Sequence, residues 1–113
     1  MKKLCCGLAA VGLLFGAVEQ VRSDFIYWCE FNGGVVQRAN LDGSGKTKLV
    51  SGLSIPLFPS LDVPDGTMYW SEQGRGNIWQ ANLDGSGPTI LVSGVSSPSG
   101  TALDIGGGQI YWA

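Results

Sequence analysis

The heptapeptide ANLDGSG occurs twice in this chain, at Ala39–Gly45 and again at Ala81–Gly87. The two copies lie 42 residues apart, and a gapless alignment of Ile26–Thr67 with Met68–Gln109 gives 21 identical pairs in 42 positions. A third copy opens at residues 110–113 with the letters IYWA. An internal repeat of this length is typical of proteins built from stacked supersecondary units, so the repeat sets the fold class.

Each repeat is predicted to contain four short β-strands. Aromatic and β-branched residues fill segments about five residues long, and Gly, Pro, Asn and Asp separate them. The expected strands are 25–30, 35–40, 47–50, 58–63, 67–72, 77–82, 89–92 and 100–105, and the third copy starts another at residue 110. Gln37 is expected on the polar side of its strand, opposite Val36. Four antiparallel strands in about 42 residues form a β-propeller blade, so an all-β fold is predicted.

The repeated LDGSG segments are predicted to be tight turns. Asp42 and Asp84 can accept hydrogen bonds from backbone amides two residues further on, and Gly43 and Gly85 supply the positive φ angles that such turns require. A calcium loop is the alternative, but calcium needs six to eight oxygen ligands and each turn offers one carboxylate. Two further repeated carboxylates, Asp62 and Asp104, are expected to accept hydrogen bonds in the turns that follow them.

The first 23 residues have the pattern of a secretory signal peptide. Lys2 and Lys3 precede an uncharged, mostly apolar segment, Leu4–Val18, which is too short to span a bilayer. Cleavage is expected before Asp24, and an uncleaved anchor or a buried helix is the alternative. The predicted domains are therefore a leader, 1–23, and a repeat region, 24–113, in a secreted, extracellular or periplasmic protein.

The charged and reactive residues of the repeat region argue against several functions. Residues 24–113 contain four basic and eight acidic side chains, which disfavours nucleic acid and anionic membranes as partners. The chain has no histidine, so it lacks a Ser-His-Asp triad, a Cys-His pair and a His-ligated metal site. Cys29 is interpreted as a small buried residue and not as a nucleophile. No catalysis, metal or cofactor is expected.

The segments IYWCE, MYWSE and IYWA, each starting a 42-residue unit, resemble the YWTD (class B) repeats of the low-density lipoprotein receptor family. The resemblance covers residue 24 to the end and implies about two blades of a six-bladed, extracellular propeller that binds protein ligands. Cys29 and Ser71 replace the Thr of that motif, and Glu30 and Glu72 replace its Asp. The chain contains no cysteine-rich modules like those that flank the propeller in the receptors.

The large repeated aromatics are predicted to pack between adjacent blades, where each buries about 150–250 Å². They are Tyr27, Trp28, Tyr69, Trp70, Tyr111 and Trp112. Trp79 takes the place of Gln37 in the second repeat, on what is expected to be the polar side of its strand. It is either an exposed or interblade residue or, as an alternative, a platform for a sugar.

The two repeats differ most at one predicted rim of the propeller. Because strands in a blade alternate in direction, the ends of the YW strands and the linkers between blades should gather at the same edge. We expect a binding face there, with a solvated loop rim as the alternative. Its residues are Glu30, Phe31, Asn32, Phe58, Glu72, Gln73 and Arg75.

The repeats supply strands two to four of one blade, one whole blade, and strands one and two of a third. This arrangement favours a piece of a longer propeller protein. Self-assembly of copies into a ring is the alternative, although the IYW strand would then be duplicated. The predicted function is non-catalytic binding of a protein ligand. A carbohydrate-binding, self-associated propeller and the remnant of a propeller lyase or lactonase are the alternatives.

Overall fold

A computed structural model describes residues 24–113 as nine antiparallel β-strands. The predicted leader lies outside the described residues. The strands are β1 (Phe25–Glu30), β2 (Val35–Asn40), β3 (Thr47–Val50), β4 (Pro56–Asp62), β5 (Thr67–Glu72), β6 (Asn77–Asn82), β7 (Thr89–Val92), β8 (Thr101–Asp104) and β9 (Gln109–Trp112). In this part of the chain, no helix is long and apolar enough to cross a membrane.

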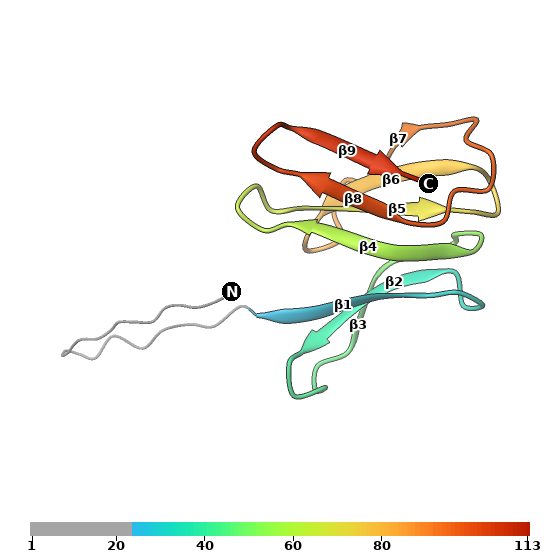
Figure 1. Cartoon of the computed structure of the whole chain (residues 1–113). Coiled ribbons are helices and arrows are strands. Elements are labelled where there is room, and N and C mark those ends of the chain that lie inside the picture. The colour runs from blue at the N-terminus through green and yellow to red at the C-terminus, as the bar shows by residue number, and fades with distance from the viewer. Residues whose placement is uncertain (1–23) are drawn as a thin grey trace.

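The strands form three sheets that lie side by side like blades (Figure 1). The first blade has the order β1–β2–β3, the second β4–β5–β6–β7, and the third β8–β9. This is the division into a partial, a whole and a partial blade that the repeat predicts, and the all-β propeller fold is confirmed. Three strands differ from the expected limits: β4 spans Pro56–Asp62 because Pro56 pairs back to Glu72, β8 is confined to Thr101–Asp104, and β9 begins at Gln109.

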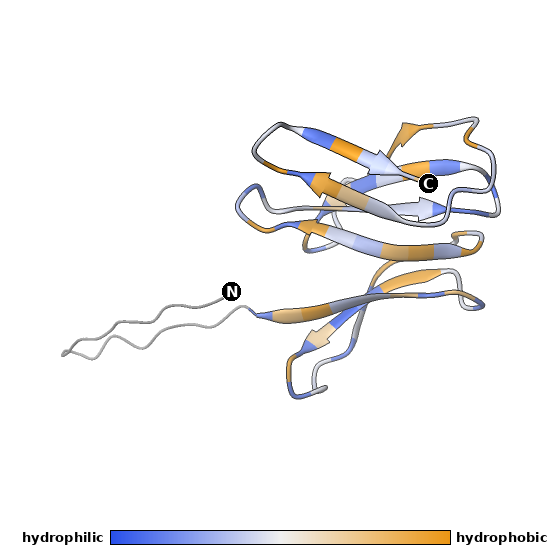
Figure 2. Ribbon diagram, viewed as in Figure 1, coloured by the Kyte–Doolittle hydropathy of each residue, from blue (hydrophilic) through white to orange (hydrophobic). Residues whose placement is uncertain are grey.

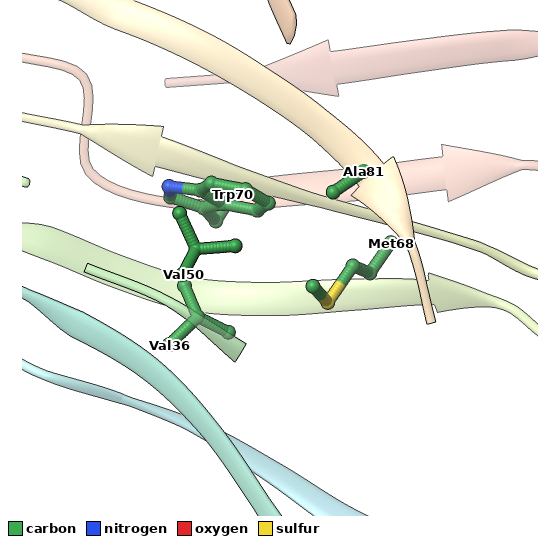
Figure 3. Packing of buried hydrophobic residues seen from close by; sticks show 5 residues of the cluster. All are labelled: Val36, Val50, Met68, Trp70 and Ala81. Carbon is green, nitrogen blue, oxygen red and sulfur yellow. The ribbon is translucent and has the colours of Figure 1, made fainter. Parts of the chain in front are cut away.

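The hydrophobic core lies between the first and second blades. Val36 and Val50 from the first blade pack against Met68, Trp70 and Ala81 from the second (Figure 3). All five are buried, and Met68 and Trp70 are completely inaccessible to solvent. Since full burial of one large apolar side chain contributes about 1.5–3 kcal/mol, this contact is a main source of cohesion between the blades. Figure 2 shows the hydrophobic residues along the strands and mostly hydrophilic or neutral residues in the turns.

Trp70 confirms the interblade packing predicted for the repeated aromatics, and the other members are less buried. Trp28 and Tyr69 are half-buried, and Tyr27 packs at the margin of the core. Tyr111 and Trp112 in β9 are exposed. Burial therefore decreases from the middle of the stack toward its ends, because only the second blade has described neighbours on both faces.

The ANLDGSG segments fold into the predicted turns. Oδ1 of Asp42 accepts hydrogen bonds from the backbone N (2.9 Å) and Oγ (2.6 Å) of Ser44, and Asp84 makes the same two bonds to Ser86. Bonds from the serine hydroxyl and amide lower the pKa of both carboxyls. Gly43 and Gly85 have φ angles of 88° and 89°. The repeated heptapeptide therefore serves local turn geometry.

Repeated carboxylates also stabilise the turns after β4 and β8. Asp62 Oδ1 accepts a hydrogen bond from the amide of Asp65, and Asp104 Oδ1 accepts one from the amide of Gly107. Both aspartates thus act as the turn acceptors that the sequence predicts.

The expected polar side of β2 and β6 is not a solvent face. Gln37 is 1% exposed, and Trp79 is half-buried with its ring stacked on Trp70 at 5.9 Å between centroids and 2° between planes. The expectation for Gln37 was wrong because side chains of its own blade surround it: Trp28 and Lys48 are its cross-strand partners, and its Nε2 donates to Glu30. In such a blade, alternation along a strand does not separate core from solvent.

Candidate functional site

The turns and linkers of the predicted rim gather at one edge of the stacked blades. The β1–β2 turn, the β5–β6 turn and both linkers between blades lie on the same side, at the right of Figure 1. The ANLDGSG turns and the β4–β5 and β8–β9 turns lie on the opposite side. The direction of successive strands produces this separation, as the repeat indicates.

The linker between the first and second blades, residues 51–55, is held from both sides by backbone hydrogen bonds. The amide of Leu53 donates to the carbonyl of Gly34 in the first blade at 3.0 Å. The amides of Gln73 and Gly74 in the second blade donate to Ile55 and Ser54 at 2.9 Å each. The linker is therefore part of the rim and fixes the two turns relative to each other.

Glu72 is the centre of a hydrogen-bond cluster beneath this linker. Its side chain is completely buried and accepts four bonds. Oε1 receives Nδ2 of Asn77 at 2.8 Å and Nε1 of Trp79 at 2.9 Å. Oε2 receives the backbone N of Ser54 at 2.9 Å and Nη1 of Arg75 at 2.7 Å. Four donors satisfy most of the acceptor capacity of a carboxylate, so Glu72 stays charged without contact with water.

The pKa of Glu72 shows the balance of two opposing effects. Burial raises this pKa, but hydrogen bonds from Trp79, Ser54 and Asn77 and the charge of Arg75 together lower it below its usual value.

The prediction that Glu72 contributes to an exposed binding face was wrong, because nothing of its side chain reaches the surface. Glu72 instead supports the rim from below.

The equivalent position in the first blade is built differently. Glu30 is exposed, and Oε1 accepts a single 3.3 Å bond from Nε2 of Gln37. Val35 and Gly33 stand where the second blade has Asn77 and Arg75, so the first blade lacks two of the four donors. The two blades thus have the same backbone fold, but the side chains that bond to the equivalent glutamates differ.

The remaining predicted rim residues are accessible to varying degrees. Phe31 is 50% exposed and Phe58 67% exposed, which is high for aromatic side chains. Asn32 is exposed beside Phe31, and Gln73 is half-buried. Phe58 follows Pro56 by two residues in β4 and has a φ of 32°, a conformation that side-chain-bearing residues rarely adopt. Strain of this kind is found where the surrounding structure over-determines a position.

Arg75 connects the buried cluster with the surface. Nη1 donates both to Glu72 Oε2 and to the carbonyl of Gly52 at 3.1 Å, while the side chain remains 56% exposed. A guanidinium has five N–H donors, so a fixed Arg75 keeps others available in a defined orientation.

Cys29, which the sequence suggests is buried, is half-buried in β1. Burial raises the pKa of the Cys29 thiol to about 12, which keeps it protonated at neutral pH. In residues 24–113, no group of three or more His, Cys, Asp and Glu side chains could hold a metal ion.

Trp79 donates its indole N–H to Glu72 and stacks on Trp70, so its ring is not an open platform for a sugar.

Sequence reasoning did not identify Ser54, Asn77 and Trp79 as partners of Glu72. One signal was available: Arg75, Asn77 and Trp79 all carry side-chain donors and all differ from their equivalents in the first repeat. Gly33 and Val35 have no side-chain donor, and Gln37 has a different one. Joint substitution around one carboxylate indicates a local cluster, but only the fold adds the amide of Ser54 from the linker.

Comparisons with known proteins support the fold. One solved chain, from a crystal structure of a nidogen/laminin complex, matches with a TM-score of 0.73 and 28% sequence identity. The match covers 78% of this chain and 34% of that chain, so this chain spans about a third of the length of the solved one. The likeness supports a propeller fold of the YWTD type. A scan of protein-family models finds no match, and a comparison with curated proteins finds none either.

Proposed function

We propose that this chain is a secreted, non-catalytic module that binds another protein through the rim carrying Phe31, Phe58 and Arg75. The observation that carries the proposal is the fixation of Arg75. A buried carboxylate and a linker carbonyl hold its guanidinium in place, while more than half of the side chain stays open to solvent.

Aromatic residues and arginine are the side chains enriched at the centres of protein interfaces. Phe31 and Phe58 expose apolar surface on the same edge of the stack, and Asn32 and Gln73 add polar groups around them. The expected partner surface presents a carboxylate to Arg75 and apolar side chains to the phenylalanines. The solved neighbour belongs to a complex of two proteins, which is consistent with a protein partner.

The proposal is tested with the purified chain immobilised and probed with an array of extracellular proteins, followed by affinity measurements on the captured partner. Separate Phe31→Ala, Phe58→Ala and Arg75→Ala variants should each weaken capture about tenfold or more, corresponding to at least about 1.4 kcal/mol. Unchanged capture by all three variants would exclude this rim as the binding face.

Two substitutions away from the rim serve as controls. Ile90→Ala removes exposed apolar surface from β7, and Lys46→Ala removes an exposed charge from the β2–β3 turn on the opposite edge (Figure 1). Both should leave capture unchanged. Loss of capture in the controls as well would indicate nonspecific attraction and contradict a defined site.

A further inference from the structure

The contact between the first and second blades shows how two blades of this chain dock. Leu83, in the turn after β6, packs against the core between the blades. Gly85 in the same turn lies so close to Leu49 of β3 that a Cβ on it would be 2.6 Å from the Leu49 carbonyl oxygen. Nη1 of Arg38 in β2 donates to the carbonyl of Leu83 at 2.9 Å. One blade thus presents a docking turn, and the other receives it.

The repeat places the same docking turn, uncovered, on the first blade. Leu41 is the equivalent of Leu83, and it is 69% exposed. Gly43 is the equivalent of Gly85, and a Cβ on it would meet nothing within 4 Å. Ile26 in β1 is 52% exposed, whereas its equivalent in β5, Met68, is completely buried. This face of the first blade has the features of a docking face that lacks its neighbour among the described residues.

The matching groove lies on the other side of the second blade. A cavity of about 560 Å³ opens between β7 and the third blade, and Leu91, Val92, Leu103 and Ile110 contribute apolar side chains to it. Leu91 is the equivalent of Leu49, the residue that receives Gly85 in the first contact, and it is 43% exposed. Figure 2 shows hydrophobic colouring on β7 and a single hydrophobic band on β9.

Two strands of the chain occupy the same repeat position but are paired on opposite edges. Ile26-Tyr27-Trp28 in β1 and Ile110-Tyr111-Trp112 in β9 are the same tripeptide at the same repeat position. β9 pairs with β8, through Ala102 opposite Tyr111, and has no further neighbour among the described residues. β1 pairs with β2 and is likewise free on its other edge in the described part of the chain.

We propose that a second copy of this chain docks its first blade into the groove, with its β1 replacing β9 beside β8. The product is a four-stranded blade with the order β8 of one copy, then β1, β2 and β3 of the other. Leu41 of the second copy enters the groove, and its Gly43 lies against Leu91 as Gly85 lies against Leu49. Gln80, the equivalent of Arg38, lies where it can donate to the Leu41 carbonyl of the second copy.

This exchange removes the strand duplication that counted against self-assembly, because β9 is displaced instead of competing with β1. Each copy then completes two blades, and three copies supply the six that the resemblance implies. The contact is head-to-tail, a geometry that closes into a ring when the rotation per copy permits. The competing occupant of the groove is a further blade on a longer chain, and in that case the 113-residue chain stays monomeric.

The first test is the mass of the purified chain in solution, measured by light scattering over a hundredfold range of concentration. We expect a discrete species of three copies. Leu41→Asp should reduce the mass to that of one copy with an unchanged far-UV circular dichroism spectrum, because Leu41 is exposed in the single chain. A folded monomer at every concentration, or a trimer that survives Leu41→Asp, would overturn the proposal.

Ile90→Lys is the matched control for this variant. Lys48 occupies the equivalent position in the first blade and is exposed even though that blade is docked. Like Leu41→Asp, Ile90→Lys replaces an exposed apolar residue with a charged one. Ile90 lies in the second blade and outside the proposed contact. It should leave the trimer intact, and dissociation by this variant would contradict the assignment of the interface.

A disulfide tests the exchanged strand directly. In the proposed blade, Ala102 of one copy lies opposite Tyr27 of the next, whereas within one chain these residues belong to the third and first blades. Oxidised Tyr27→Cys/Ala102→Cys protein should run as covalent multimers on non-reducing gels, and each single variant should not. The absence of multimers from the double variant in a sample of trimer mass would refute the strand exchange.

Discussion

Replacement of Glu72 tests whether the buried carboxylate holds the rim together. Glu72→Ala removes the acceptor for Asn77 Nδ2, Trp79 Nε1 and the Ser54 amide, while the exposed Arg75 can turn to water. A buried donor left without a partner costs about 1–3 kcal/mol. Three such donors, partly rehydrated, give an expected loss of about 3–4 kcal/mol in the free energy of unfolding.

The first blade provides the matched control. Glu30→Ala removes an exposed carboxylate that accepts one 3.3 Å bond from Gln37, so the expected loss is at most about 1 kcal/mol. Urea titrations followed by tryptophan fluorescence and circular dichroism give both values from the midpoints and slopes. If Glu72→Ala and Glu30→Ala lose the same stability within about 0.5 kcal/mol, the four-donor cluster does not stabilise the fold and the reasoning fails.

Three further predictions follow from single features of the structure. Folding lowers the pKa of Glu72 from its ordinary 4.5, so its contribution to the free energy of unfolding is present above about pH 4.5 and is lost as the pH falls through the lower folded value. The difference in stability between wild type and Glu72→Gln should therefore be constant from about pH 6 to 8 and shrink in acid. A difference that widens in acid would contradict this sign. With a thiol pKa of about 12, Cys29 should resist alkylation at pH 8 until urea unfolds the chain, as peptide mapping by mass spectrometry would show, and rapid labelling of the folded protein would disprove its burial. In urea titrations, Gly85→Ala should destabilise the fold by about 1–3 kcal/mol more than Gly94→Ala. Both glycines have a positive φ, but only a side chain at Gly85 would meet Leu49. Equal losses would show that Leu49 moves aside at no cost in stability.

The sequence by itself determined the blade architecture, because that information is local and repeated. The 42-residue period, the short aromatic strands and the Asp-Gly turns specified which segments pair and in which order. The LDGSG turns could be derived in detail, since Asp42 and Asp84 bond to residues only two positions away. The edge on which the candidate rim lies also followed from the sequence, through the direction of successive strands.

Only the tertiary structure decided which rim residues are available to a partner. Glu30 and Glu72 occupy the same repeat position, yet one is exposed and the other completely buried. The difference arises because a linker between blades brings the Ser54 amide over Glu72, a contact across 18 residues that no local pattern encodes. Gln37 is buried as well, although its face of the first blade has no described neighbouring blade; its cross-strand partners Trp28 and Lys48 and its bond to Glu30 lie within its own blade. The sequence pattern of a strand therefore predicts which strand it pairs with. Which of its side chains are exposed depends on how the blades pack, and the pattern does not predict that.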